Sequence, residues 1–179
     1  MLLGFGTLLT MAIRVEYLAN PAYGLTLTEV QVALLVTTVP SIARLFGSLV
    51  WGRLFDTMNF FTLRIVLNCS FLVSILSFFG SSSWQGLVWG AAIFGFSSSG
   101  GDVAWNLWVT KFAPPNRVPD YMAVHTFFTG VRGLLAPAVA FALLTRISPE
   151  QVSWISSGFI VLSIALLIPT RRAALNSGR

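Results

Sequence analysis

Residues 97–137 read SSSGGDVAWNLWVTKFAPPNRVPDYMAVHTFFTGVRGLLAP. The pattern predicts two apolar helices joined by a short basic loop. Each helix carries one ionisable residue deep in its apolar run, Asp102 in the first and Arg132 in the second. Ionisable side chains are costly inside a bilayer and usually mark a functional site there. This stretch therefore raises two questions: whether the chain is a membrane protein, and what the two charges serve.

The composition answers the first question. Of 179 residues, 55% are hydrophobic and only 9% are charged, and the mean hydropathy is +0.80. A soluble domain carries about 25% charged residues, and a small domain cannot bury so much apolar surface against itself. We therefore expect an all-α integral membrane protein whose main partner is the lipid bilayer. The net charge of +5 is explained below by membrane sidedness, so no nucleic-acid partner is expected.

Six apolar segments are each long enough to cross a hydrocarbon core, which needs about 20 helical residues. They lie at about 2–18, 29–54, 60–80, 85–112, 120–145 and 152–170. Thr28 is the predicted N-cap of the second segment, and Pro40 predicts a kink inside it. The connections are short, so neighbouring helices are expected to be antiparallel within a single six-helix domain spanning residues 1–179. A single cysteine, Cys69, excludes a disulfide framework and a zinc cluster.

The basic residues predict the orientation, because cytoplasmic loops are enriched in Lys and Arg. With a cytoplasmic N-terminus, the outside flanks hold only Arg14 and Arg146. The inside flanks then hold Arg53, Arg64, Lys111, Arg117, Arg171, Arg172 and Arg179. We expect both termini to be cytoplasmic, and the membrane to be a bacterial inner membrane.

Three ionisable residues are predicted to share one depth. With a rise of about 1.5 Å per residue, Arg44, Asp102 and Arg132 lie roughly 14, 15 and 18 Å from the cytoplasmic ends of their helices. Polar neighbours follow at helical spacing, which places them on the same helix face as the charge. These neighbours are Thr37, Ser41 and Ser48 beside Arg44; Ser98 and Asn106 beside Asp102; and His125 and Thr129 beside Arg132.

The junction at residues 52–61, GRLFDTMNFF, resembles the cytoplasmic loop motif of the major facilitator superfamily. That motif has a Gly-x-Leu-x-Asp core followed by basic residues and a glycine. Gly52, Leu54 and Asp56 match the core, whereas Phe60 and Phe61 stand where basic residues are expected. With its six-helix pattern, the whole chain resembles the C-terminal six-helix half of such a transporter.

The resemblance implies secondary active transport of a small solute by alternating access, with a proton as one candidate coupling ion and without an organic cofactor. Gly52, Arg53 and Asp56 would belong to the loop that latches the cytoplasmic gate. The first, second, fourth and fifth helices would line a cavity completed by a second six-helix half or by a second copy. No metal site and no enzymatic activity are expected.

The candidate substrate or proton-site residues are Asp102, Arg132, Arg44, Asn106, His125 and Trp105. Two arginines against one aspartate favour an anionic or zwitterionic solute. The same charges could instead form an interhelical ion pair that only fixes the packing, and His125 could be a structural histidine. Trp105 and Trp108 could face lipid. The run at 95–101 could be a locally unwound binding segment, but we favour close helix packing for it. For Gly130, Gly133 and Pro137 we likewise expect close helix contact, together with a kink or hinge.

Two other classes of function remain. An intramembrane hydrolase is disfavoured because Ser99-Gly-Gly-Asp102 has no second intramembrane aspartate to share a proton with, and no Gly-x-Ser-x-Gly elbow is present. A non-transporting scaffold, or an inactive truncated half, is the stronger alternative, because the chain is half-sized and its first helix looks clipped. Extraction followed by a size measurement would separate a strict monomer from a paired assembly.

Overall fold

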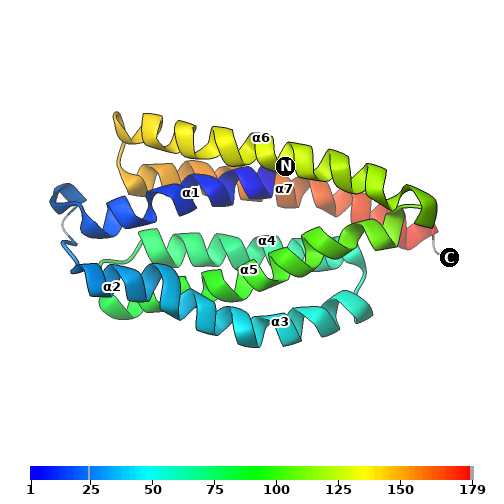
Figure 1. Cartoon of the computed structure of the whole chain (residues 1–179), viewed down its shortest axis with the longest axis horizontal. Coiled ribbons are helices and arrows are strands. Elements are labelled where there is room, and N and C mark those ends of the chain that lie inside the picture. The colour runs from blue at the N-terminus through cyan, green and yellow to red at the C-terminus, as the bar shows by residue number, and fades with distance from the viewer. Residues whose placement is uncertain (24, 178–179) are drawn as a thin grey trace.

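The computed structural model describes residues 1–23 and 25–177, with side chains to residue 171, and these residues are almost entirely helical (Figure 1). The long helices are α1 (Leu2–Ala19), α3 (Val39–Thr57), α4 (Phe60–Phe79), α5 (Trp84–Phe112), α6 (Val118–Leu144) and α7 (Pro149–Ser177). Shorter elements are η1 (Pro21–Tyr23), α2 (Glu29–Ala33), η2 (Leu34–Thr38) and η3 (Pro115–Arg117).

The second predicted segment is one continuous rod, built from α2, η2 and α3. Thr28 is confirmed as its N-cap: the Thr28 hydroxyl accepts from the Gln31 N–H, and the Gln31 side chain accepts from the Thr28 N–H. Near Pro40, where the sequence predicts a kink, the rod contains a π-helical turn, η2, which ends two residues before the proline. A proline ring clashes with the carbonyl four residues earlier, and a widened turn is one way in which a helix relieves such a clash.

Five of these rods are long and apolar enough to cross a membrane: Leu2–Ala19, Glu29–Thr57, Phe60–Phe79, Pro115–Leu144 and Pro149–Arg171. The helix α5 is also long, at 29 residues, but its polar run from Ser97 to Asp102 makes it less apolar. It packs against both α3 and α4, so protein covers much of its surface. The fold class is therefore confirmed as an all-α, membrane-spanning bundle.

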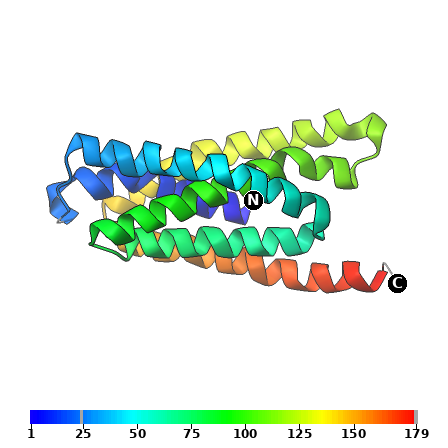
Figure 2. The ribbon, with the colours of Figure 1, turned by 90° about the horizontal axis from the view of Figure 1, so that it is seen from below.

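The rods form two layers. One layer holds α6, α1 and α7; the other holds α2–α3, α5 and α4 (Figure 1). The layers are joined mainly where α4 packs along α7, and these two helices lie side by side along one edge (Figure 2). By contrast, α6 packs mainly on α1 and makes few contacts with α5. The two layers are thus closed along α4 and α7 and separated along α5 and α6.

The loops sort to two ends. The α3–α4 and α5–α6 loops lie at one end with the C-terminal part of α7, and the α1–α2, α4–α5 and α6–α7 loops lie at the other (Figure 1). We call the first end the basic end, because four basic residues belong to the helix ends and the loop found there. They are Arg53 near the end of α3, Lys111 near the end of α5, Arg117 in η3 and Arg171 in the C-terminal part of α7.

Close packing explains the glycines of α5. A Cβ atom at Gly95 would stand 2.1 Å from the Pro40 carbonyl oxygen, and one at Gly100 would stand 2.5 Å from the Trp51 ring. The close-packing interpretation is confirmed for this run, which stays helical rather than unwound. The same interpretation is wrong for Gly130 and Gly133: no described atom lies within 4 Å of a Cβ built at either, because their side of α6 faces away from its neighbours.

Candidate functional site: a cavity between α5 and α6

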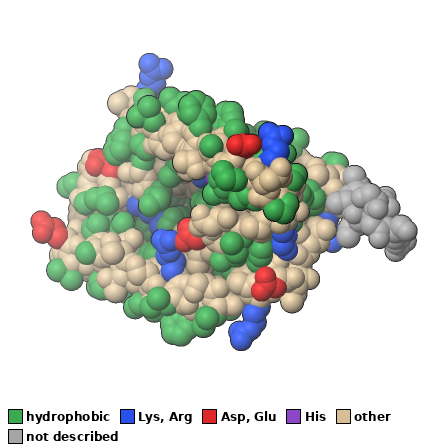
Figure 3. Space-filling model, turned by 45° about the vertical axis from the view of Figure 1, so that its right-hand side comes forward, with side chains coloured by type: hydrophobic (Ala, Val, Ile, Leu, Met, Phe, Trp, Pro, Cys, Tyr) green, Lys and Arg blue, Asp and Glu red, His purple; other side chains and the backbone are tan. Residues whose placement is uncertain are grey.

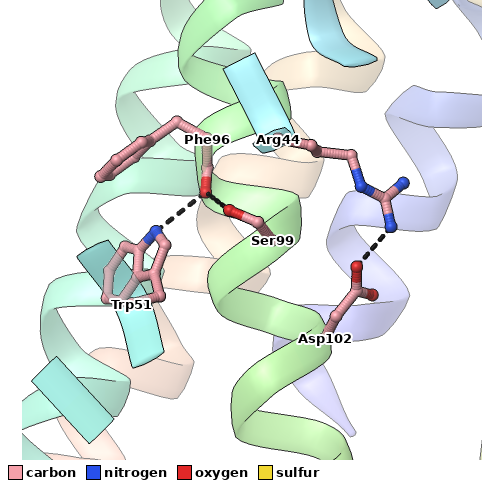
Figure 4. Close-up of polar contacts among 5 residues, drawn as sticks. All are labelled: Arg44, Trp51, Phe96, Ser99 and Asp102. Carbon is pink, nitrogen blue, oxygen red and sulfur yellow. Dashed lines mark hydrogen bonds and ion pairs between the residues drawn. The ribbon is translucent and has the colours of Figure 1, made fainter. Parts of the chain in front are cut away.

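Arg44 on α3 and Asp102 on α5 form an ion pair between Nη2 and Oδ2 (Figure 4). Their side chains are 50% and 48% exposed. One further hydrogen bond joins the same two helices: the Trp51 Nε1–H of α3 donates to the Phe96 carbonyl oxygen of α5 at 2.8 Å, and the Ser99 hydroxyl, also on α5, donates to the same oxygen at 2.7 Å. The interhelical ion pair considered from the sequence is thus present for these two charges.

Arg132 on α6 lies apart from that pair. It is buried, with 6% of its surface exposed, and its guanidinium carbon stands 4.7 Å from the centroid of the Trp105 ring. Among the described residues it forms no ion pair, and its Nε has no hydrogen-bond partner. On α1, a Cβ atom at Gly4 would stand 2.0 Å from Arg132 Nη1. The guanidinium therefore lies against bare backbone on α1 and an indole ring on α5.

Arg132 borders a partly open cavity of about 610 Å³. The surface between the two layers is hollowed when the molecule is turned to bring its basic end forward, and charged side chains border the hollow (Figure 3). The polar and aromatic lining comes from three helices and a loop: Phe60, Arg64, Trp105, Trp108, Arg117, Asp120, Tyr121, His125, Phe128, Thr129 and Arg132. Apolar side chains complete the wall.

The cavity carries an excess of positive charge. Among the described residues that line it, one is a carboxylate, Asp120, and it pairs with Arg117 at 3.3 Å. Arg64 and Arg132 have no carboxylate within ion-pair distance among the described residues. Two uncompensated guanidinium groups in a largely apolar cavity make an environment that favours an anion.

The sequence-predicted candidates divide between the two places. His125, Thr129 and Arg132 all line the cavity, as their helical spacing predicts. Trp105 and Trp108 line it as well, and the Trp108 ring lies 5.6 Å from the His125 ring between centroids. Asn106 is exposed and does not line the cavity. Thr37, Ser41 and Ser48 are exposed along their rod.

Arg64 is a cavity residue that the sequence interpretation placed only at a cytoplasmic flank. It lies in the second turn of α4, on the side that meets α6 across the cavity. The sequence feature that could have indicated a cavity position is that Arg64 lies four residues after the start of the helix and not in the loop.

Arg14 corrects the sequence interpretation. It was placed in an outside flank, yet it is 1% exposed inside the bundle. Its guanidinium carbon stands 3.6 Å from the Phe94 ring centroid and 4.7 Å from that of Phe78. The physical reason is that α1 runs on to Ala19, more than one helical turn past Arg14. This charge belongs to the protein core, so it carries no information on the sidedness of the loops.

The loop motif lies at the end of α3. Arg53 and Asp56 are exposed there and form no ion pair with another described residue, and a Cβ at Gly52 would meet no described atom within 4 Å. Lys111 of α5 holds this helix end instead: its Nζ donates to the Phe55 carbonyl at 2.6 Å and stands 4.2 Å from the Phe55 ring centroid. The described residues contain no cluster of His, Cys, Asp or Glu that could hold a metal ion.

The comparison with protein families gives one match, and it covers nearly the whole chain. The sequence profile of the family described as Major Facilitator Superfamily matches residues 1–177. A search of curated proteins finds no match. The family match agrees with the membrane-spanning helices and with the loop motif at Gly52–Asp56, and it indicates a transporter-type function. The chain belongs to the major facilitator superfamily.

Proposed function

We propose that this chain is a six-helix half of a secondary active transporter, the C-terminal one, and that it binds a small anionic or zwitterionic solute in the cavity between α5 and α6. The observation that carries the proposal is the charge balance of the cavity. Arg64 and Arg132 have no described carboxylate partner, and they line about 610 Å³ of space, which lies in the usual size range of small-molecule sites, roughly 300–1,000 Å³.

The Arg44–Asp102 pair supports a second six-helix unit as partner, either the other half or a second copy. Both side chains are about half exposed, and charged groups in membrane segments usually face a bundle interior or water rather than lipid. Thr37, Ser41 and Ser48, which share the Arg44 face of this rod by helical spacing, are exposed as well. A partner covering this face would enclose a central cavity, and the two units would alternate between inward-open and outward-open arrangements.

The energy source in this proposal is an ion gradient, with the proton as coupling ion. We propose Asp102 or His125 as the side chain that carries the coupling proton. Asp102 is bound to Arg44, whereas His125 lies in the cavity beside Trp108. Proton release from one of them would change the charge that faces the solute. Gly52, Arg53 and Asp56 act in this proposal as the gate loop at the cytoplasmic side of a bacterial inner membrane.

The test is uptake into proteoliposomes that contain the purified chain, using a panel of small anions, zwitterions and neutral solutes. We expect uptake of an anionic or zwitterionic solute, reduced at least tenfold by Arg132→Gln and by Asp102→Asn. Gly133→Ala is the matched control on α6, because a Cβ there meets nothing within 4 Å. A chain that is monomeric in the bilayer and inactive toward the whole panel would support a non-transporting scaffold and overturn the proposal.

A further inference from the structure

The geometry points to a narrower class of solute than a small anion: we infer that the cavity binds an organic carboxylate with a flat, apolar body. The carboxylate lies on the guanidinium of Arg132, and the body lies against the aromatic wall. This inference deepens the proposed function and rests on it for the location of the site. Four features of the cavity support the inference. These are the unused hydrogen-bond donors of Arg132, the fixed position of its guanidinium group, the aromatic lining, and the small number of polar side chains in that lining.

Arg132 is prepared for a planar anion. A guanidinium group has five N–H donors in a rigid fork that matches a carboxylate through two parallel hydrogen bonds. In this structure none of these donors is used by a described residue, while the Trp105 ring lies 4.7 Å from the guanidinium carbon. The Arg132 Nε is buried, so the two terminal nitrogens, Nη1 and Nη2, are the donors that a carboxylate would meet.

Gly4 allows Arg132 to hold this position. A Cβ at residue 4 would stand 2.0, 2.4 and 2.8 Å from Nη1, Cζ and Nε of Arg132. Any side chain at this position would therefore have to displace the whole guanidinium group. We assign Gly4 as a positioning residue, because it contributes no polar group of its own and acts only through the arginine.

The rest of the cavity suits a flat apolar body. Phe60, Trp105, Trp108, Tyr121 and Phe128 all line it, and aromatic faces favour offset or edge-to-face contact with another ring. Besides the arginines and the Arg117–Asp120 pair, the polar lining side chains are few, chiefly His125, Thr129 and the hydroxyl of Tyr121. A solute with many hydroxyl groups would lose hydrogen bonds to water without replacing them here.

Three related solutes should bind less well. Inorganic phosphate would satisfy the arginines but would leave the aromatic wall unused. A neutral aromatic alcohol would fill the space and leave Arg64 and Arg132 without a counter-charge, at a low-dielectric site where that is unfavourable. A flexible aliphatic carboxylate would satisfy Arg132 but would lose rotamer freedom on binding and could not stack.

The experiment measures binding to the purified full chain in nanodiscs by the quenching of tryptophan fluorescence, with calorimetry as an independent readout. The probes are benzoate, hexanoate, benzyl alcohol and inorganic phosphate. We expect benzoate to bind at least tenfold more tightly than each of the other three. Equal binding of hexanoate or phosphate would overturn the requirement for a flat body, and equal binding of benzyl alcohol would overturn the role of the carboxylate.

Variants test the assigned positions. Arg132→Lys keeps the charge but loses the fork, and we expect it to weaken benzoate binding at least tenfold; Gly4→Ala should do the same without changing any polar group. Gly133→Ala, one residue from Arg132, should leave the affinity unchanged. Trp105→Leu provides a further test if Gly4→Ala does not fold. Unchanged benzoate affinity in folded Arg132→Lys and Trp105→Leu variants would overturn the inference.

The two proposals can fail separately. Benzoate binding with the expected ranking, but without uptake of any solute by proteoliposomes, would support this inference and contradict transport by the chain. Uptake of another anion together with no benzoate binding would support transport and overturn the flat carboxylate.

Discussion

Arg14 is a charged side chain held among aromatic rings. Its guanidinium carbon lies within 4.7 Å of the ring centroids of both Phe78 and Phe94, and its Nε and Nη2 have no described hydrogen-bond partner. Contact with the face of an aromatic ring stabilises a cation, and the three-carbon stem of arginine packs like an apolar chain. The stem and the rings together explain how the residue fits its place in α1.

We predict that Arg14→Met is far better tolerated than Arg14→Ala. Methionine retains the length and volume of the stem, and a buried charge without a partner adds little net stability. Alanine would leave a cavity, which costs about 2–5 kcal/mol for a large buried side chain. Thermal unfolding in detergent, followed by circular dichroism, checks the ranking. An Arg14→Met variant as unstable as Arg14→Ala would mean that the charge itself stabilises the bundle.

Part of the candidate site is predictable from the sequence. Helical spacing correctly placed His125, Thr129 and Arg132 on one cavity face, because a helix of regular pitch fixes which side chains share a face. Depth counting put Arg44, Asp102 and Arg132 in one layer, but depth does not say which helices face each other. Arg44 pairs with Asp102, and Arg132 with Trp105, because of the way in which neighbouring helices pack side by side. Counting residues along a single helix does not give this information.

The α3–α5 contact is the most extensive contact between two helices of the bundle. Small residues on both helices allow this: Gly47 of α3 lies against Phe96 and Ser99, and Gly95 of α5 lies against Pro40. Close approach then brings Trp51 within hydrogen-bond distance of the Phe96 carbonyl. In membranes such close packing replaces the hydrophobic effect as the force between helices. The same two helices carry Arg44 and Asp102, so this packing also sets their pairing.

Two glycine variants are predicted to have opposite effects. Gly95→Ala would place a Cβ 2.1 Å from the Pro40 carbonyl oxygen, and because that neighbour is backbone, we expect destabilisation of about 1–3 kcal/mol or more. Gly130→Ala meets nothing within 4 Å and should stabilise the chain by about 0.4–1 kcal/mol, because alanine restricts the unfolded chain and is the better helix former. The test compares the thermal unfolding midpoints of both variants with that of the wild type. A Gly95→Ala midpoint equal to that of the wild type would contradict the α3–α5 packing.

The helices themselves were within reach of the sequence. Long apolar runs separated by Asn20-Pro21, Ser81–Ser83 and Pro114-Pro115 mark helix ends by ordinary rules, since proline and small polar residues interrupt helices. For this part of the chain the sequence predicts a kink at Pro40, and it does not predict the π-helical turn at Leu34–Thr38. A proline shows where the hydrogen bonds along a helix are interrupted, but the packing of neighbouring helices also decides how the backbone adjusts. In this protein Gly95 of α5 packs against the backbone of Pro40.

At the scale of the whole molecule, the order of packing was not predictable from the sequence. The chain pairs α3 with α5 and α1 with α6, whereas the successive helices α5 and α6 make few contacts. In a bilayer most faces of a helix are apolar whether they meet lipid or protein, so hydropathy does not reveal which face meets which helix. The correction at Arg14 has the same origin: its burial depends on Phe78 and Phe94 from two other helices.

The two-ended arrangement of the loops leads to a prediction of sidedness. With Arg14 removed from the count, Arg146 is the only basic residue in the flanks at the end opposite the basic end, within the described residues. Basic residues near helix ends favour the cytoplasm, so we expect the α5–α6 loop to be cytoplasmic and the α4–α5 loop to face outside. Asn116 and Ser82 are exposed residues of these two loops.

Single-cysteine labelling tests this orientation. Cys69 is first replaced by serine, and Asn116→Cys and Ser82→Cys are then introduced separately. In intact spheroplasts a membrane-impermeant maleimide should label Ser82→Cys and spare Asn116→Cys, whereas both should react after the membrane is permeabilised. Labelling of Asn116→Cys alone in intact spheroplasts would reverse the orientation. The basic end would then face the outside, and Gly52–Asp56 could not serve as a cytoplasmic gate loop.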